Sequence, residues 1–97
     1  MANSRRPAII AGLRTPFARS GTVFRDVSAV QLARRATQEL LLRTALDGRL
    51  VDEVAFGQVV ASALAPNVAR EVSLLPQLPR TIPAFSVNRA CASAGQA

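Results

Sequence analysis

The C-terminal stretch of the chain reads AFSVNRACASAGQA over residues 84–97, and it indicates the fold class. Its first part, Ala84 to Val87, is a short run rich in β-formers that follows a linker bracketed by prolines. The small residues from 90 to 97 have good or neutral helix propensity. A strand that passes directly into a helix is typical of α/β proteins, and this pattern puts Cys91 at the strand-to-helix turn.

Two further segments are predicted to be strands. Residues 7–12 hold a short apolar run between a proline and a glycine, which is typical of a buried strand. Residues 54–60 are rich in β-formers and include Gly57, a residue that allows another backbone to approach closely. With the strand at 84–87, this gives three predicted strands, all parallel in one sheet.

Two helices are predicted between these strands. Ser28 begins a capping box, and apolar residues then recur at helical spacing, so a helix is expected over 28–45 with Gly48 as the residue that ends it. Asn67 is a suitable N-cap for a second helix over 67–75. The resulting order is βαβαβ, a parallel α/β sheet with covering helices.

The composition is that of a globular chain. It has 97 residues, of which 49% are hydrophobic, and a mean hydropathy of +0.22, enough for a packed core. Several apolar runs are too continuous to have one face in water, and so short a chain buries only part of its surface. We therefore expect that this α/β unit is incomplete.

The net charge of +6 comes with twelve arginines and no lysine or histidine. Such a charge is compatible with a basic module that binds anions or nucleic acid. The arginines are scattered, however, and the chain has no tyrosine or tryptophan on which bases could stack. We therefore expect no nucleic-acid partner.

The single cysteine excludes a disulfide framework within the chain, and the absence of histidine leaves no ligand set for a metal site. The N-terminal apolar run is too short for a secretory signal, and no segment approaches the length of a membrane span. We expect a cytoplasmic protein with no membrane-spanning segment and no metal.

Two interpretations of Cys91 remain open from the residues alone. Amides at a helix N-terminus favour a thiolate, and small neighbours leave room for a substrate, so Cys91 is a candidate nucleophile. A lone cysteine is also commonly a small buried apolar residue.

Five segments, taken together, resemble the N-terminal part of a thiolase, an acetyl-CoA C-acyltransferase, and are most similar to the β-oxidation branch that includes the β subunit of the trifunctional complex. The resemblance rests on RTPF at 14–17, the helix start at 26–32, VDEVAFG at 51–57, NVAR at 67–70, and the pattern N-x-x-C-x-S-x-x-Q-A at 88–97.

The resemblance implies that Cys91 is the acyl-accepting nucleophile. It implies 3-ketoacyl-CoA as substrate and coenzyme A as co-substrate, with no other cofactor. It further implies a homo-oligomer that joins near the strand at 84–87, which should lie at an exposed sheet edge, and association with a hydratase/dehydrogenase subunit. Arg14 and Asn88 are expected to hold their loops by hydrogen bonds rather than to touch substrate.

The family's remaining catalytic motifs, Asn-Glu-Ala-Phe, Gly-His-Pro and Cys-x-Gly, do not occur in the chain. It is therefore expected to be an N-terminal thiolase fragment that is inactive by itself, with a disordered tail at 1–6 and a partial thiolase N-terminal domain at 7–97. The alternative is a non-catalytic remnant or interaction module.

Overall fold

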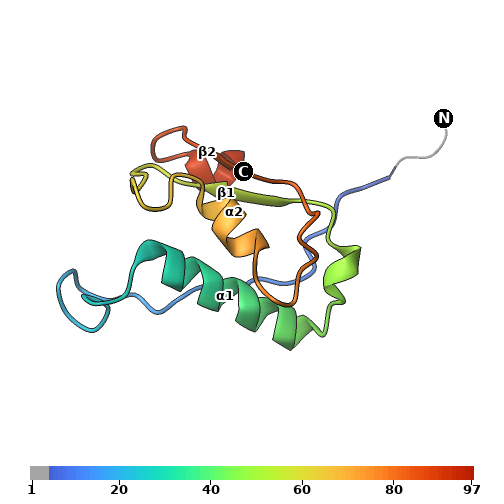
Figure 1. Ribbon diagram of the computed structural model, residues 1–97, viewed down its shortest axis with the longest axis horizontal. Helices are drawn as coiled ribbons and strands as arrows, with labels where there is room; N and C mark the ends of the chain where they lie inside the picture. Colours follow the sequence, from blue (N-terminus) through green and yellow to red (C-terminus); the bar gives the residue numbers. More distant parts are fainter. Residues whose placement is uncertain (1–4) are drawn as a thin grey trace.

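The computed structural model describes residues 5–97 (Figure 1). Two strands in this range pair in parallel, with Val54 opposite Ala84 and Gly57 opposite Val87. The α/β class and the parallel orientation are thereby confirmed. The elements are, in order, α1 (Ala29–Thr44), the 3₁₀ helix η1 (Gly48–Leu50), β1 (Val54–Gly57), α2 (Val68–Ser73), β2 (Ala84–Val87) and α3 (Ser93–Gln96).

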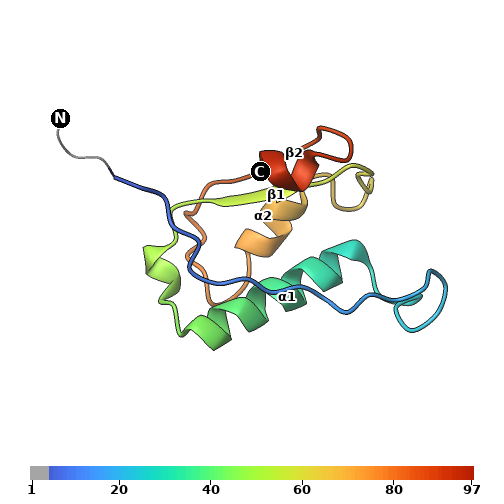
Figure 2. The same cartoon turned by 180° about the vertical axis from the view of Figure 1, so that it is seen from behind.

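Helix α2 joins the helical and sheet parts of the fold. In both views it lies between the sheet and the longer helix α1, and α3 lies at the sheet (Figures 1 and 2). The buried cluster consists of Val72, Leu75, Leu78 and Ile82. Side chains of α1 and β1 pack against this cluster, so α2 and the turns that follow it supply the centre of a small core.

The predicted capping box at the start of α1 is confirmed. The Ser28 hydroxyl oxygen accepts a hydrogen bond from the Gln31 amide at 3.1 Å, and the Gln31 side-chain oxygen accepts one from the Ser28 amide at 2.8 Å. Two amides that would otherwise lack a partner are satisfied in this way, which explains why the helix begins here. Asn67 likewise caps α2, as predicted.

Gly48 does not end α1, and that prediction is wrong. The helix stops at Thr44, and Ala45 takes the left-handed conformation with φ 52°. Gly48 instead begins η1 and packs against another backbone, since a Cβ there would lie 3.0 Å from the carbonyl carbon of Gln77. The glycine is required for this close approach rather than for a positive φ.

The predicted strand at 7–12 is absent, so the sheet of the described residues has two strands instead of three. Residues 5–19 have no regular secondary structure, and Ile9 and Ile10 are 97% and 86% exposed. A strand needs a hydrogen-bonding neighbour, and β1 and β2 pair only with each other in this range.

The N-terminal segment also makes the molecule longer than a compact chain. The radius of gyration is 14.7 Å, against about 12.5 Å for a compact domain of this length. Of the predicted tail at 1–6, residues 1–4 lie outside the described residues, and residues 5 and 6 are exposed. No helix within 5–97 has both the length and the apolar character needed to cross a membrane.

The remaining boundaries differ by a few residues. Strand β1 stops at Gly57 rather than at residue 60, although the Gln58 amide still donates to the Val87 carbonyl at 2.9 Å. Beyond that bond Val60 is exposed, because β2 ends at Val87 and offers no further partner. Helix α2 is shorter than the predicted 67–75 by one residue at its start and two at its end.

Candidate active site

Cys91 lies on the turn of residues 88–92, which connects β2 to α3 and is called the Cys91 turn below. The strand-to-helix position predicted from the sequence is therefore confirmed. The side chain is exposed, so the interpretation of Cys91 as a buried core residue does not hold. An exposed thiol at such a turn is accessible to a substrate.

Asn88 fixes the first half of the Cys91 turn. Its side-chain oxygen accepts a hydrogen bond from the Ala90 amide at 2.9 Å, and its side-chain nitrogen donates to the Val59 carbonyl at 3.2 Å. The first bond is local turn chemistry typical of asparagine, and the second ties the turn to the segment after β1. The expectation that Asn88 holds the turn is confirmed.

Ser93 fixes the second half of the turn from the first residue of α3. Its hydroxyl oxygen accepts a hydrogen bond from the Arg89 amide at 2.8 Å and donates to the Ala90 carbonyl at 2.6 Å. The side chain is only 3% exposed, so these bonds are shielded from water. Loss of both would leave the buried Ser93 hydroxyl without a partner, which is costly.

Ala90, directly before the cysteine, has an uncommon backbone conformation, with φ 44°. For a residue with a Cβ the left-handed region costs roughly 1 to 2 kcal/mol. Its amide is held by Asn88 and its carbonyl by Ser93, so the surrounding hydrogen bonds impose this conformation. The backbone that presents the thiol is thus determined from both sides.

The last polar residue of the C-terminal motif also stabilises the turn. The Gln96 side-chain oxygen accepts a hydrogen bond from Arg89 Nη1 at 2.9 Å. Asn88 and Ser93 therefore hold the backbone around Cys91, and Gln96 holds the side chain of Arg89. This explains why these residue types accompany the cysteine at their particular spacing.

Gly57, at the end of β1, lies directly against α3. A Cβ at this position would be 2.5 Å from the Ser93 carbonyl carbon and 2.7 Å from the Ala94 Cα, far closer than carbon atoms can approach. The close backbone approach that the sequence predicted for Gly57 is confirmed. Its partner, the helix after the Cys91 turn, could not be identified from the sequence.

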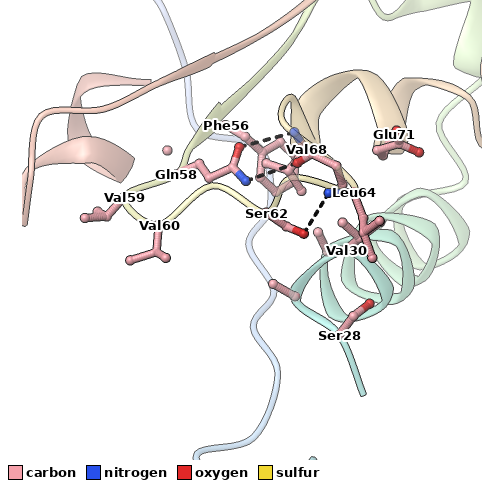
Figure 3. A pocket seen from close by; sticks show the side chains of 14 residues that line it. Ser28, Val30, Phe56, Gln58, Val59, Val60, Ser62, Leu64, Val68 and Glu71 are labelled. Atoms are coloured by element: carbon pink, nitrogen blue, oxygen red, sulfur yellow. Dashed lines mark hydrogen bonds between the residues drawn. The ribbon is translucent and has the colours of Figure 1, made fainter. Parts of the chain in front are cut away.

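The segment after β1 also lines a cleft of about 600 Å³ (Figure 3). The Gln58 side chain lines it, accepting a hydrogen bond from the Val68 amide at 3.3 Å and donating to the Ala65 carbonyl at 3.5 Å. Most other lining side chains are apolar, and Cys91 is not among them. Sequence reasoning missed this cleft, because it is formed by parts of α1, β1, α2 and the segment between β1 and α2, some of which are distant in sequence.

In the described part of the chain, Arg14 makes its contacts away from the Cys91 turn. Its Nη1 donates to the Thr15 carbonyl at 3.1 Å, and its guanidinium carbon lies 4.6 Å from the centre of the Phe17 ring. Both contacts are within the RTPF segment itself, as expected for a residue that holds its own loop.

The Cys91 turn presents an exposed thiol. The chain contains no histidine and no second cysteine. Acyl transfer from carbon needs groups that accept and return protons as well as a nucleophile. This arrangement can thus present a thiol to a substrate, but the chain offers no histidine and no second thiol for the proton transfers.

The comparisons with known proteins agree on one family. Residues 7–97 match the family described as thiolase, N-terminal domain. The 3-ketoacyl-CoA thiolase of Aeromonas salmonicida (strain A449) is 51% identical over 92 residues, covering 95% of this chain and 21% of that protein. The 3-ketoacyl-CoA thiolase of Vibrio cholerae serotype O1 (strain ATCC 39541) is 50% identical over 95 residues, covering 98% and 22%.

A solved structure supports the same relation. The crystal structure of the Bacillus anthracis acetyl-CoA acetyltransferase superposes with a TM-score of 0.80 at 30% sequence identity, covering 88% of this chain and 22% of that one. The chain therefore spans about a fifth of the length of the relatives it matches.

Proposed function

The chain belongs to the thiolase family, whose N-terminal domain it matches over residues 7–97, and on this premise we propose that the protein containing it cleaves 3-ketoacyl-CoA through Cys91. The observation that carries the proposal is the exposed thiol of Cys91 on a turn whose shape Asn88 and Ser93 fix. The names of the most similar relatives, 3-ketoacyl-CoA thiolases, support the choice of substrate.

The proposed reaction has two halves. The Cys91 thiolate attacks the C3 carbonyl carbon of 3-ketoacyl-CoA, the bond between C2 and C3 breaks, and the acetyl-CoA enolate that leaves takes up a proton. The acyl group is then held on Cys91 as a thioester. The thiolate of coenzyme A attacks this thioester, releasing an acyl-CoA shortened by two carbons and restoring the Cys91 thiolate.

In this mechanism the described residues bind no cofactor, and coenzyme A is a co-substrate. Groups that deprotonate the thiols and protonate the enolate are needed, and the chain has neither a histidine nor a second cysteine for these tasks. We therefore propose that the 97 residues alone form no product, and that activity belongs to a protein as long as the relatives.

The proposed setting is fatty acid β-oxidation in the cytoplasm, in a homo-oligomer that associates with a hydratase/dehydrogenase subunit. Within residues 5–97 the sheet contains only β1 and β2, so one edge of β2 has no strand partner. Phe85 on that strand is 39% exposed. An open edge with an exposed aromatic side chain supports association through this strand.

The test is a chimera. The N-terminal section of the Aeromonas salmonicida 3-ketoacyl-CoA thiolase is replaced by these 97 residues, and cleavage of 3-ketoacyl-CoA by coenzyme A is measured. We expect turnover by the chimera and none by the 97 residues alone. Changing Cys91→Ser in the chimera should lower kcat by about a thousandfold or more, as expected when a nucleophile is lost.

The unmodified relative is the control for assay and folding. Mass spectrometry of the chimera, stopped after substrate addition without coenzyme A, should show the acyl group on Cys91. A Cys91→Ser chimera with full activity would rule out the proposed nucleophile. A folded but inactive chimera would favour the non-catalytic alternative.

A further inference from the structure

We propose that Gly57 positions the Cys91 turn, because a residue with no side chain is the only kind that lets α3 rest on the end of β1. The consequence for catalysis rests on the proposed function of Cys91. The consequence for the backbone of the turn does not, and it can be measured separately.

The first argument is the distance between the two backbones. A Cβ on Gly57 would lie 2.5 Å from the Ser93 carbonyl carbon and 2.7 Å from the Ala94 Cα. These are main-chain atoms, which cannot rotate away as the end of a flexible side chain could. Any residue other than glycine at position 57 must therefore move the start of α3 or the end of β1.

The second argument is what the start of α3 holds in place. Ser93 is 3% exposed, and its hydroxyl forms hydrogen bonds with the Arg89 amide, two residues before the cysteine, and with the Ala90 carbonyl, one residue before it. A shift of Ser93 lengthens these bonds. Ala90 is kept at φ 44° by such bonds, so it would relax towards an ordinary conformation and change the direction of the Cys91 side chain.

The third argument is that the neighbours of Gly57 hold the other end of the turn. The Gln58 amide donates to the Val87 carbonyl at 2.9 Å, and the Val59 carbonyl accepts from the Asn88 side chain at 3.2 Å. Residues 57–59 thus contact the chain on both sides of the cysteine, at Val87 and Asn88 before it and at the start of α3 after it. A displacement at Gly57 would be transmitted to both ends.

Two other glycines provide matched controls. A Cβ on Gly48 would also meet main-chain atoms, lying 3.0 Å from the Gln77 carbonyl carbon, but this contact is between η1 and the segment after α2. A Cβ on Gly95, within α3 itself, would have nothing within 4 Å. Gly48→Ala therefore reports general strain, and Gly95→Ala reports the added methyl group alone.

The experiment measures amide hydrogen exchange by NMR in the 97-residue chain and in the variants Gly57→Ala, Gly48→Ala and Gly95→Ala. The reporters are the amides of Arg89, Ala90, Ala92 and Ser93, which all donate hydrogen bonds within the turn. We expect Gly57→Ala to lower their protection at least about tenfold relative to core amides of α2 in the same sample. The two controls should leave that ratio unchanged.

A wild-type ratio in Gly57→Ala, or an equal loss in Gly48→Ala, would overturn the proposal. If Gly57→Ala leaves the isolated chain unfolded, the proposal is tested in the chimera instead, where the rate of Cys91 acylation is measured per folded molecule. A positioning role predicts a fall of about tenfold or more in that rate with little change in KM for Gly57→Ala only, and an unchanged rate overturns it. The exchange result is independent of catalysis, so failure of the nucleophile assignment remains distinguishable.

Discussion

The apolar run at residues 8–11 and strand β1 are both four residues long, yet they behave differently in the structure. Residues of β1 are half-buried, pair with β2 and pack on α2. Ile9 and Ile10 are almost fully exposed and belong to no regular element. A short apolar run becomes a strand only where a neighbour supplies hydrogen bonds and a cover, and here only β1 has both.

The same contrast applies to polar side chains. The Asn67 side-chain oxygen accepts from the Ser86 hydroxyl at 2.7 Å, and the Ser86 hydroxyl oxygen in turn accepts from the Ala69 amide at 3.1 Å. The start of α2 is therefore bonded to β2 across the fold. Around 7–19, by comparison, the side-chain hydrogen bond of Arg14 reaches only the next residue. Long-range polar contacts are concentrated where the core is.

The largest expected effect sharpens this contrast by removing equivalent apolar groups from the two regions. Val72 on α2 is fully buried, so Val72→Ala should lower the free energy of unfolding by about 2 to 3 kcal/mol, through lost burial and the cavity left behind. Ile9→Ala should change it by less than about 0.5 kcal/mol. Urea unfolding followed by circular dichroism measures both, and a comparable loss in Ile9→Ala would mean that residue 9 is packed.

An intermediate effect is expected from two helix caps, one in each kind of setting. Asn67 caps α2 and also bonds Ser86, so Asn67→Ala should cost about 2 kcal/mol, the upper end for a cap. Ser28 caps α1 at an exposed position, and Ser28→Ala should cost about 1 kcal/mol or less. Thermal unfolding of the two variants compares them directly. Equal losses would show that the bond from α2 to β2 contributes little.

The smallest effect concerns a charge pair in the connection between α1 and β1. A hydrogen bond from the Arg49 side chain, together with one from its amide, lowers the pKa of Asp47 to about 2 from its usual 3.8. Because the folded-state pKa is the lower one, the carboxylate stabilises the folded state above about pH 4, and this contribution is lost as the pH falls through 2.

Asp47→Asn should accordingly lower the melting temperature slightly at pH 7, and most of this difference should be lost by pH 2. The shift should be smaller than for either cap, because the pair is exposed to solvent. Melting curves of both proteins across this pH range provide the measurement. A difference as large at pH 2 as at pH 7 would assign the effect to the cap of η1 rather than to the charge.

Local signals in the sequence were sufficient to predict most of the elements. The caps at Ser28 and Asn67 are formed by residues within three positions of each other, so their pattern is visible in the sequence. The two wrong predictions, a strand at 7–12 and Gly48 as the residue that ends α1, have a common cause. Whether an apolar run is paired, or which backbone a glycine lies against, depends on residues far away in the chain.

The candidate site divides in the same way. The sequence predicted that Cys91 lies between a strand and a helix and that Asn88 holds the turn, since both are local properties. The two hydrogen bonds of Ser93 and the contact between Gly57 and α3 could not be predicted, although the glycine itself was a signal of close approach. Those contacts exist only after β1 and β2 have been brought together.

The parallel register of the sheet bears on the order in which the chain folds. Val54 pairs with Ala84, 30 positions later, so the intervening segment must close into a loop, at a cost in chain entropy, before this pairing can stabilise the fold. Contacts within α1 are local and form within microseconds, whereas pairing of this kind is slower. Because α3, which follows the Cys91 turn, packs against Gly57 of β1, we expect the thiol to reach its native position among the last steps of folding.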